Sequence, residues 1–317
     1  NEDHSTLGAL DKSFKDIIKK LGESGWLKYT IPRAYGGALE TFDVRHMALA
    51  RSILGYHSGL ADFGFAMQGL GSGSITLFGS DELKKRYLPD VGTGKRTAAF
   101  AISEPQSGSD ARNMKTYAKK NGDKYIINGT KNWVTSGQNS DLVICFCLTK
   151  TEEKRKNISC FVIEKNTPGL KTGKKEDKLG IRASDTCELY FDNCIIPESN
   201  LLGSEGQGFE IAMNALSGGR IGIAAQAVGL ARAALEKSLS YSSERIQFNR
   251  PINTFGSIRK KIANMATHLE AARLLVGKAA YLKDKGKKHN KESSMAKLFA
   301  SKIAMEASIE CVQIHGS

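Results

Sequence analysis

One segment of the sequence combines serine, glutamate, proline and glycine in a pattern that could hold a ligand. In Ala99–Asp110 (AFAISEPQSGSD) an apolar run leads into Ser, Glu and Pro and then into a Gly/Ser loop. Backbone N–H groups and hydroxyls in such a loop suit a phosphate or the edge of a heteroaromatic ring. An ordinary turn after a strand uses the same residues, so the pattern alone leaves both interpretations open.

A second segment, Asn128–Gly137 (NGTKNWVTSG), places an aromatic ring two residues before a hydroxyl. Trp133 and Thr135 alternate in a predicted strand, and residues two apart on a strand point to the same face. A ring beside a hydroxyl suits a flat ligand. The residue type by itself favours the alternative, a tryptophan buried in the core.

Two further segments carry arginines that could bind phosphate. In Leu216–Ala224 (LSGGRIGIA) an arginine sits among glycines on a predicted helix, where it could reach a phosphate at close range. In Ser242–Ile252 (SSERIQFNRPI) Arg245 and Arg250 lie at a predicted helix end. A surface arginine on a closely packed helix and a charged helix terminus are equally good interpretations.

The charge balance favours an anionic partner without identifying it. Lys+Arg minus Asp+Glu is 46 − 33 = +13 over 317 residues, which suits nucleic acid, anionic lipid, a phosphate-rich cofactor or an acidic protein. The basic residues are dispersed, with local clusters at 171–178 and 283–291. A dispersed excess is more typical of a solvated surface, and no helix-turn-helix or RNA-binding motif is present, so we expect no nucleic-acid role.

Composition limits the other classes of protein. With 40% hydrophobic residues, a sizeable core is expected, and no apolar run reaches the length of a membrane-spanning helix. The first residues show no secretory signal. The six cysteines form no CxxC and have no metal-ligand spacing with histidine. We therefore expect free, buried thiols in a reducing compartment and no metal site.

The hydrophobic period changes twice along the chain, which predicts an α+β fold with a β region in the middle. Residues 1–95 read as helical, with a Gly/Ser-rich interruption at 67–74 and a helix capped by Ser80. Residues 96–205 read as a β barrel or sandwich, in which Asn121-Gly122-Asp123 is a hairpin turn. No GxGxxG follows a strand, which disfavours a Rossmann domain.

Residues 206–317 read as long helices again. One is predicted to cover nearly forty residues from about 206, and two more cover roughly 255–285 and 291–313. Glycines interrupt the first helix at 218, 219, 222 and 229. Glycine weakens a helix by about 1 kcal/mol per site, so we expect these positions to allow close approach of another backbone or of a ligand.

In this order and at these distances, the segments resemble the flavin-dependent acyl-CoA dehydrogenases, nearest to the short-chain or butyryl members. The resemblance runs from Gly25–Gly37 (GWLKYTIPRAYGG) to Val312–Ser317 (VQIHGS). The stretches ISEPQSGSD and SSERIQF, followed by VQIHG, are its most specific parts. It implies an N-terminal helical domain, a middle β domain and a C-terminal helical bundle, here expected to be truncated.

The resemblance implies FAD as cofactor and assigns residues to it. Phe100, Ile102 and Ser103 would line the flavin pyrimidine edge, and Ser109 would hold the pyrophosphate and approach the pantetheine. Trp133 would flank the isoalloxazine, and Thr135 would bond near its N5. The FAD of a neighbouring subunit would be reached by Arg245, Gln247, Phe248, Gln313, Gly316 and Ser317, which implies a dimer or tetramer. Ser217, Gly218, Gly219 and Arg220 would meet the CoA part of the substrate.

The implied reaction is α,β-dehydrogenation of a short- or medium-chain acyl-CoA, followed by reoxidation through an electron-transfer flavoprotein. The expected compartment is a bacterial cytoplasm or a mitochondrial matrix. No residue matches either position at which the family places its catalytic glutamate. The first of these positions is expected beyond Ser317, and the second is occupied by Gly219. Glu104 is not a candidate base, because the family has this glutamate within its flavin-loop motif as well. Gly256 and Lys260 also depart from a common glutamine and a common aromatic.

Two alternatives follow from these departures and from the charge. The substrate could be a thioester on an acyl carrier protein, since such carriers are acidic and the chain is basic. The chain could also bind flavin or acyl-CoA without turnover. An incomplete chain explains the absent glutamate better, because a bundle without its last helices exposes an apolar face.

Overall fold

The computed structural model describes residues 7–152 and 155–316, and the chain divides into two compact units. The first unit comprises Asn1–Phe42 and Phe63–Ala215, and the second comprises Asp43–Asp62 and Leu216–Ser317. The α+β class predicted from the hydrophobic periods is confirmed. The three sequence-based domain limits, 1–95, 96–205 and 206–317, stay a prediction.

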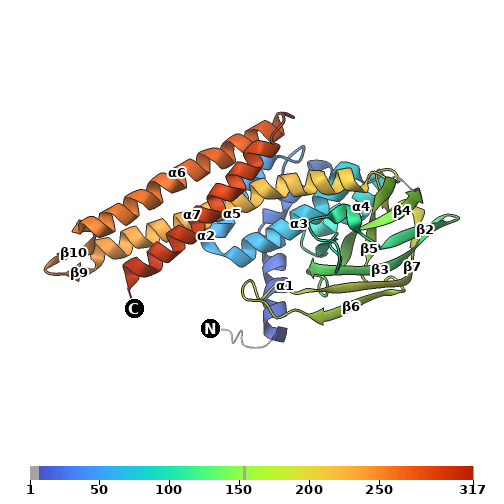
Figure 1. Ribbon diagram of the computed structural model, residues 1–317, viewed down its shortest axis with the longest axis horizontal. Helices are drawn as coiled ribbons and strands as arrows, with labels where there is room; N and C mark the ends of the chain where they lie inside the picture. The colour runs from blue at the N-terminus through green and yellow to red at the C-terminus, as the bar shows by residue number, and fades with distance from the viewer. Residues whose placement is uncertain (1–6, 153–154, 317) are drawn as a thin grey trace. The chain divides into compact units, whose positions relative to one another are not determined.

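The first unit combines helices with one eight-stranded sheet (Figure 1). Its helical elements include α1 (Leu7–Glu23), η1 (Trp26–Thr30), η2 (Arg33–Tyr35), most of α3 (Gly59–Phe78), α4 (Asp81–Gly92), and the start of α5 (Gly208–Glu244). The strands are β1 (Ala98–Ala101), β2 (Tyr117–Asn121), β3 (Lys124–Thr135), β4 (Leu142–Glu152), β5 (Arg155–Glu164), β6 (Leu170–Lys175), β7 (Thr186–Pro197) and β8 (Leu201–Leu202). They lie in the order β6-β7-β3-β2-β4-β5-β8, and β1 pairs in parallel with β4.

Two sequence signals in this unit are confirmed. The hairpin predicted at Asn121-Gly122-Asp123 joins β2 to β3, and Gly122 has the positive φ of 60° that such a turn requires. The Ser80 side chain accepts a hydrogen bond from the backbone of Leu83 at 3.3 Å and so caps α4. Short local signals of this kind depend only on neighbouring residues, which is why they could be read directly.

Strand β4 is buried on both faces, which explains its uninterrupted apolar sequence, LVICFCL. One face, including Leu142, Ile144 and Phe146, joins a core shared with residues of α3 and α4. The other face, including Val143 and Cys145, joins a core formed among the strands. Five of the six cysteines are buried free thiols, as predicted, and Cys311 is half-buried.

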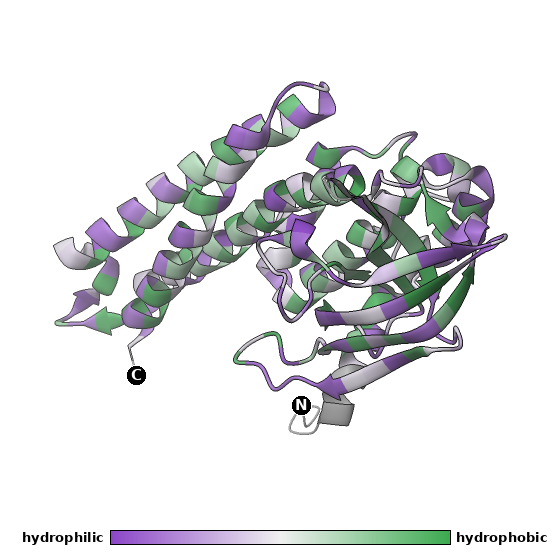
Figure 2. Ribbon diagram, turned by 45° about the vertical axis from the view of Figure 1, so that its right-hand side comes forward, coloured by the Kyte–Doolittle hydropathy of each residue, from purple (hydrophilic) through white to green (hydrophobic). Residues whose placement is uncertain are grey.

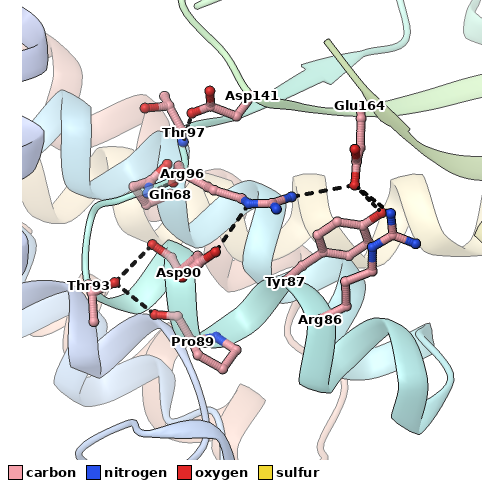
Figure 3. Close-up of polar contacts among 10 residues, drawn as sticks. All are labelled: Gln68, Arg86, Tyr87, Pro89, Asp90, Thr93, Arg96, Thr97, Asp141 and Glu164. Atoms are coloured by element: carbon pink, nitrogen blue, oxygen red, sulfur yellow. Dashed lines mark hydrogen bonds and ion pairs between the residues drawn. The ribbon is translucent and has the colours of Figure 1, made fainter. Parts of the chain in front are cut away.

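A cluster of charged side chains ties α4 to the end of β5 (Figure 3). Glu164 accepts hydrogen bonds from Arg86 at 2.9 Å and from the Tyr87 hydroxyl at 3.0 Å, and Arg96 lies 3.5 Å away. Arg96 also forms an ion pair with Asp90 at 3.2 Å. Burial, followed by the charge of Glu164, raises the pKa of Tyr87 to about 12. The hydroxyl therefore stays a hydrogen-bond donor at every physiological pH.

The start of β1 is fixed by two side chains from other elements (Figure 3). The buried amide of Gln68 donates to the Arg96 carbonyl at 2.8 Å and accepts from the Ala98 N–H at 3.0 Å. The Asp141 carboxylate accepts from the Thr97 N–H at 2.8 Å. These bonds satisfy backbone groups just before and at the first residue of β1. They hold the strand that leads into the 102–110 loop.

The interruption predicted at 67–74 is wrong, because these residues lie inside α3. The physical reason is close packing against β1. A Cβ built on Gly71 would lie 2.2 Å from the Ala98 Cβ, so only glycine allows this approach. Tertiary packing therefore outweighs the low helix propensity of the Gly/Ser stretch.

The second unit is helical, as predicted. It contains α2 (Val44–His57), the larger part of α5, α6 (Gly256–Asp284), α7 (Asn290–His315), and a small hairpin of β9 (Ile246–Gln247) and β10 (Arg250–Pro251). Figure 2 shows hydrophobic and hydrophilic bands alternating along the long helices, as expected for helices with one packed face. Among the residues that the structure describes, no helix is both long and apolar enough to cross a bilayer.

Helices α2 and α5 approach closely through two of the predicted glycines. A Cβ on Gly229 would lie 2.2 Å from the Ser52 carbonyl oxygen, and one on Gly222 would lie 2.4 Å from Arg51 Nη1. Arg51 in turn forms a buried bidentate pair with Asp62, at 2.8 and 2.6 Å. Burial raises the pKa of Asp62, while the Arg51 guanidinium opposes that shift. The glycines therefore serve helix packing here, one of the uses expected for them.

We expect Gly229→Ala to destabilise the protein by at least about 2 kcal/mol, because the added methyl overlaps backbone that cannot rotate away. Gly277→Ala on α6 is the matched control, since nothing lies within 4 Å of its Cβ position. This control should stabilise by about 1 kcal/mol through helix propensity alone. Urea unfolding of both variants measures the difference. Equal effects of the two substitutions would contradict the close α2–α5 contact.

Candidate functional site

A buried ion pair anchors the loop between β1 and η3 (Ala111–Asn113), which carries the SEPQSGSD sequence. Lys131 on β3 is 0% exposed, and its Nζ lies 2.8 Å from Glu104 Oε1. The same ammonium donates to the Ile102 carbonyl at 3.1 Å. An isolated buried charge is very costly, so the pair persists only if both members keep these partners.

The Glu104 carboxylate has further hydrogen-bond donors. The N–H groups of Lys115 and Thr116 donate to it at 2.6 and 3.0 Å, and the Gln106 amide donates at 2.7 Å. Burial alone would raise the pKa of Glu104, but the Lys131 ammonium and the donors of Lys115 and Thr116 lower it to about 2. The side chain is therefore ionised at all physiological pH values and is a weak base.

The rest of the loop closes on itself and leaves hydroxyls at its rim. Glu104 and Ser107 exchange backbone hydrogen bonds at 2.9 and 3.0 Å, and the Ser107 hydroxyl donates to the Asp110 carbonyl at 2.6 Å. Ser109 is exposed, and open space surrounds the Cβ position of Gly108. Ser109 is thus accessible to a ligand, whereas Ser107 is used within the loop.

Trp133 is not a core residue, so the interpretation favoured by its residue type is wrong. Its side chain is 61% exposed and its backbone has φ 58°, at a register shift of β3 against β7 between Lys131 and Val134. A bulky residue in the left-handed region is strained, and such strain concentrates at functional sites. Val134 takes the core position instead.

The strained end of β3 lies beside the start of the loop. The Asn132 N–H donates to the Ser103 carbonyl at 2.8 Å, and the Asn132 side chain accepts from the Trp133 N–H at 2.8 Å. Thr135 is half-buried at the end of the strand. The structure therefore brings Ser103, Trp133 and Thr135 into one region.

The remaining predicted residues of the first unit, Phe100 on β1 and Ile102 just after it, support this region. Phe100 is half-buried and packs on Phe146 with ring centroids 4.9 Å apart. Ile102 is half-buried, and its carbonyl is held by Lys131. An exposed indole, a loop with an accessible hydroxyl and a rigid backbone form a surface that fits a flat heteroaromatic group with an attached phosphate. These side chains and the loop are therefore suited to bind a flavin ring and its attached phosphates.

Predicted site residues of the second unit fall into two segments. Arg245, Gln247 and Phe248 lie at the end of α5 and in the β9–β10 hairpin, where Phe248 is 87% exposed with φ 51°. Gln313 and Gly316 lie at the end of α7, and Ser317 is outside the described residues. Tyr241 stacks on His315 with ring centroids 4.3 Å apart. That stack brings the two segments together.

The predicted substrate residues Ser217, Gly218, Gly219 and Arg220 occupy successive positions of α5. Gly219 is exposed, and the other three are half-buried. Lys283 of α6, which the sequence marked only as part of the basic cluster 283–291, lies 3.4 Å from the Ser217 hydroxyl.

Lys131 is the other residue that sequence analysis missed, although a signal for it existed. Tyr125, Ile127 and Lys131 share the buried positions of β3 at intervals of two and four residues. A lysine on the inward face of a strand requires a buried partner. The alternation of buried positions along β3 therefore indicated that Lys131 points inward. It could not indicate that Glu104 forms the ion pair with this lysine.

We expect Glu104→Gln to destabilise the protein by about 3–5 kcal/mol at neutral pH, because Lys131 loses its counter-charge inside the fold. The carboxylate has a pKa lowered from 4.5 to about 2. Its contribution is thus complete above the ordinary pKa and is lost as the pH falls toward 2. The difference in unfolding free energy between wild type and variant should therefore shrink below about pH 4.5. Denaturant unfolding across this range, at fixed FAD concentration, measures it.

The matched control is Glu198→Gln, which removes an exposed partner of Lys120 on the same sheet. Exposed pairs contribute at most about 1 kcal/mol. The double variant Glu104→Gln/Lys131→Met should cost less than the sum of the single changes, because neither charge is then left alone. Additive single effects would contradict the coupling.

Comparison with known proteins identifies the family. Family models described as the N-terminal, middle and C-terminal domains of acyl-CoA dehydrogenase match residues 6–95, 99–194 and 206–317. An acyl-CoA dehydrogenase of Bacillus subtilis (strain 168) is 46% identical over 309 residues, which cover 95% of this chain and 79% of the relative.

Solved structures agree with the sequence comparison. Butyryl-CoA dehydrogenase from Megasphaera elsdenii has a TM-score of 0.87 and 36% identity, covering 97% of this chain and 88% of its own. An acyl-CoA dehydrogenase from Bacillus anthracis, complexed with FAD, has a TM-score of 0.88 and 34% identity, covering 100% of this chain and 58% of its own. The chain therefore belongs to the acyl-CoA dehydrogenase family.

Proposed function

We propose that the protein is an FAD-dependent dehydrogenase that converts a short-chain acyl-CoA to the trans-2-enoyl-CoA. The observation that carries this proposal is the loop locked by Glu104 and Lys131 beside the exposed, strained Trp133. Family membership, the butyryl-CoA dehydrogenase of M. elsdenii and the FAD complex from B. anthracis support it. The relatives named here carry CoA in their names, so they do not favour an acyl-carrier-protein substrate or a protein without turnover.

Residues of the first unit are proposed to hold the flavin. Trp133 would cover one side of the ring, Thr135 would donate a hydrogen bond to it, and Phe100, Ile102 and Ser103 would line its edge. The accessible Ser109 hydroxyl would meet the pyrophosphate. When bound, FAD supplies the acceptor for the β-hydride of the substrate. Aromatic cover also excludes water, which strengthens the hydrogen bonds around the reacting thioester.

The α-proton of a thioester is weakly acidic, so its removal needs stabilisation of negative charge on the carbonyl oxygen. Ser217, Gly218, Gly219 and Arg220 are proposed to meet the CoA part and thereby to position the acyl chain. Glu104 is unsuited as the base, because it is ionised, buried and bonded to Lys131. None of the residues named in this site is therefore proposed to abstract the proton.

The oligomeric state and the electron acceptor of the protein are also proposed from the family resemblance. Arg245, Gln247, Phe248, Gln313, Gly316 and Ser317 are proposed to contact the FAD of a neighbouring subunit in a dimer or tetramer. The 87% exposure of Phe248 supports this role, since a single chain leaves that ring uncovered. An electron-transfer flavoprotein is proposed as acceptor, in a bacterial cytoplasm or a mitochondrial matrix.

We expect the purified protein to bind FAD, and we expect butyryl-CoA, added without oxygen, to shift the visible absorbance of the bound flavin because the acyl chain packs beside it. Bleaching with crotonyl-CoA as product is a further outcome that needs a base in addition to the flavin. Bleaching by these 317 residues would also place a base among them. Absence of flavin after reconstitution, or a flavin spectrum that no acyl-CoA changes, would contradict the proposal.

We expect Trp133→Ala to weaken FAD binding by roughly 2- to 10-fold, since aromatic stacking is worth about 0.5–1.5 kcal/mol. Titration of flavin fluorescence gives the dissociation constant. Tyr117→Ala removes another exposed aromatic ring from the same sheet and is the control. If both variants bind FAD alike, Trp133 does not contact the flavin.

A further inference from the structure

A lysine of α6 reaches the part of α5 to which sequence analysis assigned the substrate. Lys283 Nζ lies 3.4 Å from the Ser217 hydroxyl oxygen. A Cβ on Gly218 would lie 3.3 Å from the same nitrogen, so the absence of a side chain there gives the ammonium its room. The lysine is half-buried and directed at α5, not extended into solvent.

Lys283 has no carboxylate within ion-pair distance among the described residues. The adjacent acid, Asp284, is engaged at the start of α2. It accepts hydrogen bonds from the N–H groups of Val44 and Arg45 at 2.8 and 3.1 Å, and from Arg45 Nε at 2.9 Å. Burial lowers the pKa of Lys283, and only the charge of Asp284 opposes this shift.

One other basic group, His289, lies close to this ammonium. The pKa of His289 is lowered by burial and then by the charge of Lys283, and a neutral or cationic imidazole cannot neutralise that ammonium. Arg220 follows Ser217 by three residues on α5, which places both on neighbouring positions of one helix face. No ion pair of Arg220 occurs in the described ranges. Ser217 therefore meets the Lys283 ammonium and shares a helix face with Arg220, and neither cation has an ion-pair partner among the residues that the structure describes.

We infer that Ser217, Arg220 and Lys283 form a binding site for an oxyanion of the substrate. This inference rests on the proposed function, which supplies the substrate class. A phosphate of the CoA part and a carboxylate at the far end of a dicarboxylic acyl chain share the required chemistry. Ammonium, guanidinium and hydroxyl donors bind both kinds of oxyanion through charge-assisted hydrogen bonds. A half-buried cation that served only packing would need a carboxylate beside it to neutralise its charge, as Asp62 lies beside Arg51.

The test is isothermal titration of the FAD-loaded protein with CoA, pantetheine and glutaryl-pantetheine. Lys283→Met keeps most of the unbranched apolar side chain and removes the charge. We expect it to weaken one of the two anionic probes by roughly 10-fold or more, the size expected for loss of a charge-assisted hydrogen bond. Weaker CoA binding with unchanged glutaryl-pantetheine binding assigns the site to phosphate. The opposite result assigns it to an acyl carboxylate.

Lys278→Met, at an exposed lysine of the same helix, is the matched control and should leave all three affinities unchanged. Lys283→Arg should retain most of the affinity. Arg220→Met should weaken the same probe as Lys283→Met, and these two variants keep the test open if Lys283→Met does not fold.

The inference is overturned if the Lys283 and Arg220 variants bind CoA and glutaryl-pantetheine as the wild type does. It is also overturned if Lys278→Met loses as much affinity as Lys283→Met. Failure of the proposed function looks different. In that case a probe still binds through Lys283, while no acyl-CoA changes the flavin spectrum.

Discussion

The candidate site depends on the ion pair between Glu104 and Lys131. Each charge is removed from water, and only its partner, together with the surrounding N–H and carbonyl groups, offsets that cost. The pair joins a loop that has little regular structure to the middle of a strand that is held on both sides. The loop can therefore be rigid without a core of its own, and its accessible hydroxyl keeps a fixed position relative to Trp133.

The strand before this loop is fixed by equally specific contacts. Gln68 satisfies backbone groups at the start of β1, and Gly71 allows α3 to lie against Ala98. Beside β1, strand β4 is buried on both faces, which leaves it no freedom to shift register without moving apolar residues into water. Rigid elements thus lead directly into the loop. A binding site on such elements keeps its geometry better than one on a mobile segment.

Local sequence signals predicted much of this fold, and long-range constraints account for what they missed. The helices of residues 208–315 and the hairpin at Gly122 follow from periods and turn residues, which depend on near neighbours. The helical state of residues 67–74 depends on packing against Ala98, which the local sequence does not contain. Long-range constraints also explain what the sequence did not predict at the candidate site. The exposure of Trp133 follows from a positive φ and a register shift, and the partner of Lys131 is 27 residues away.

Two cations from other helices, Arg51 of α2 and Lys283 of α6, lie against glycines of α5. They differ in whether a carboxylate neutralises them. At Gly222 the neighbouring Arg51 is bonded bidentately to Asp62, so that cation is neutralised inside the fold and serves packing. One turn earlier, Lys283 approaches Gly218 and Ser217, and no described residue gives it such a carboxylate, since Asp284 is engaged by the start of α2. Both glycines admit a cation to the helix surface. Only at Ser217 does the positive charge remain uncompensated, and a protein that handles anionic thioesters has a use for it there.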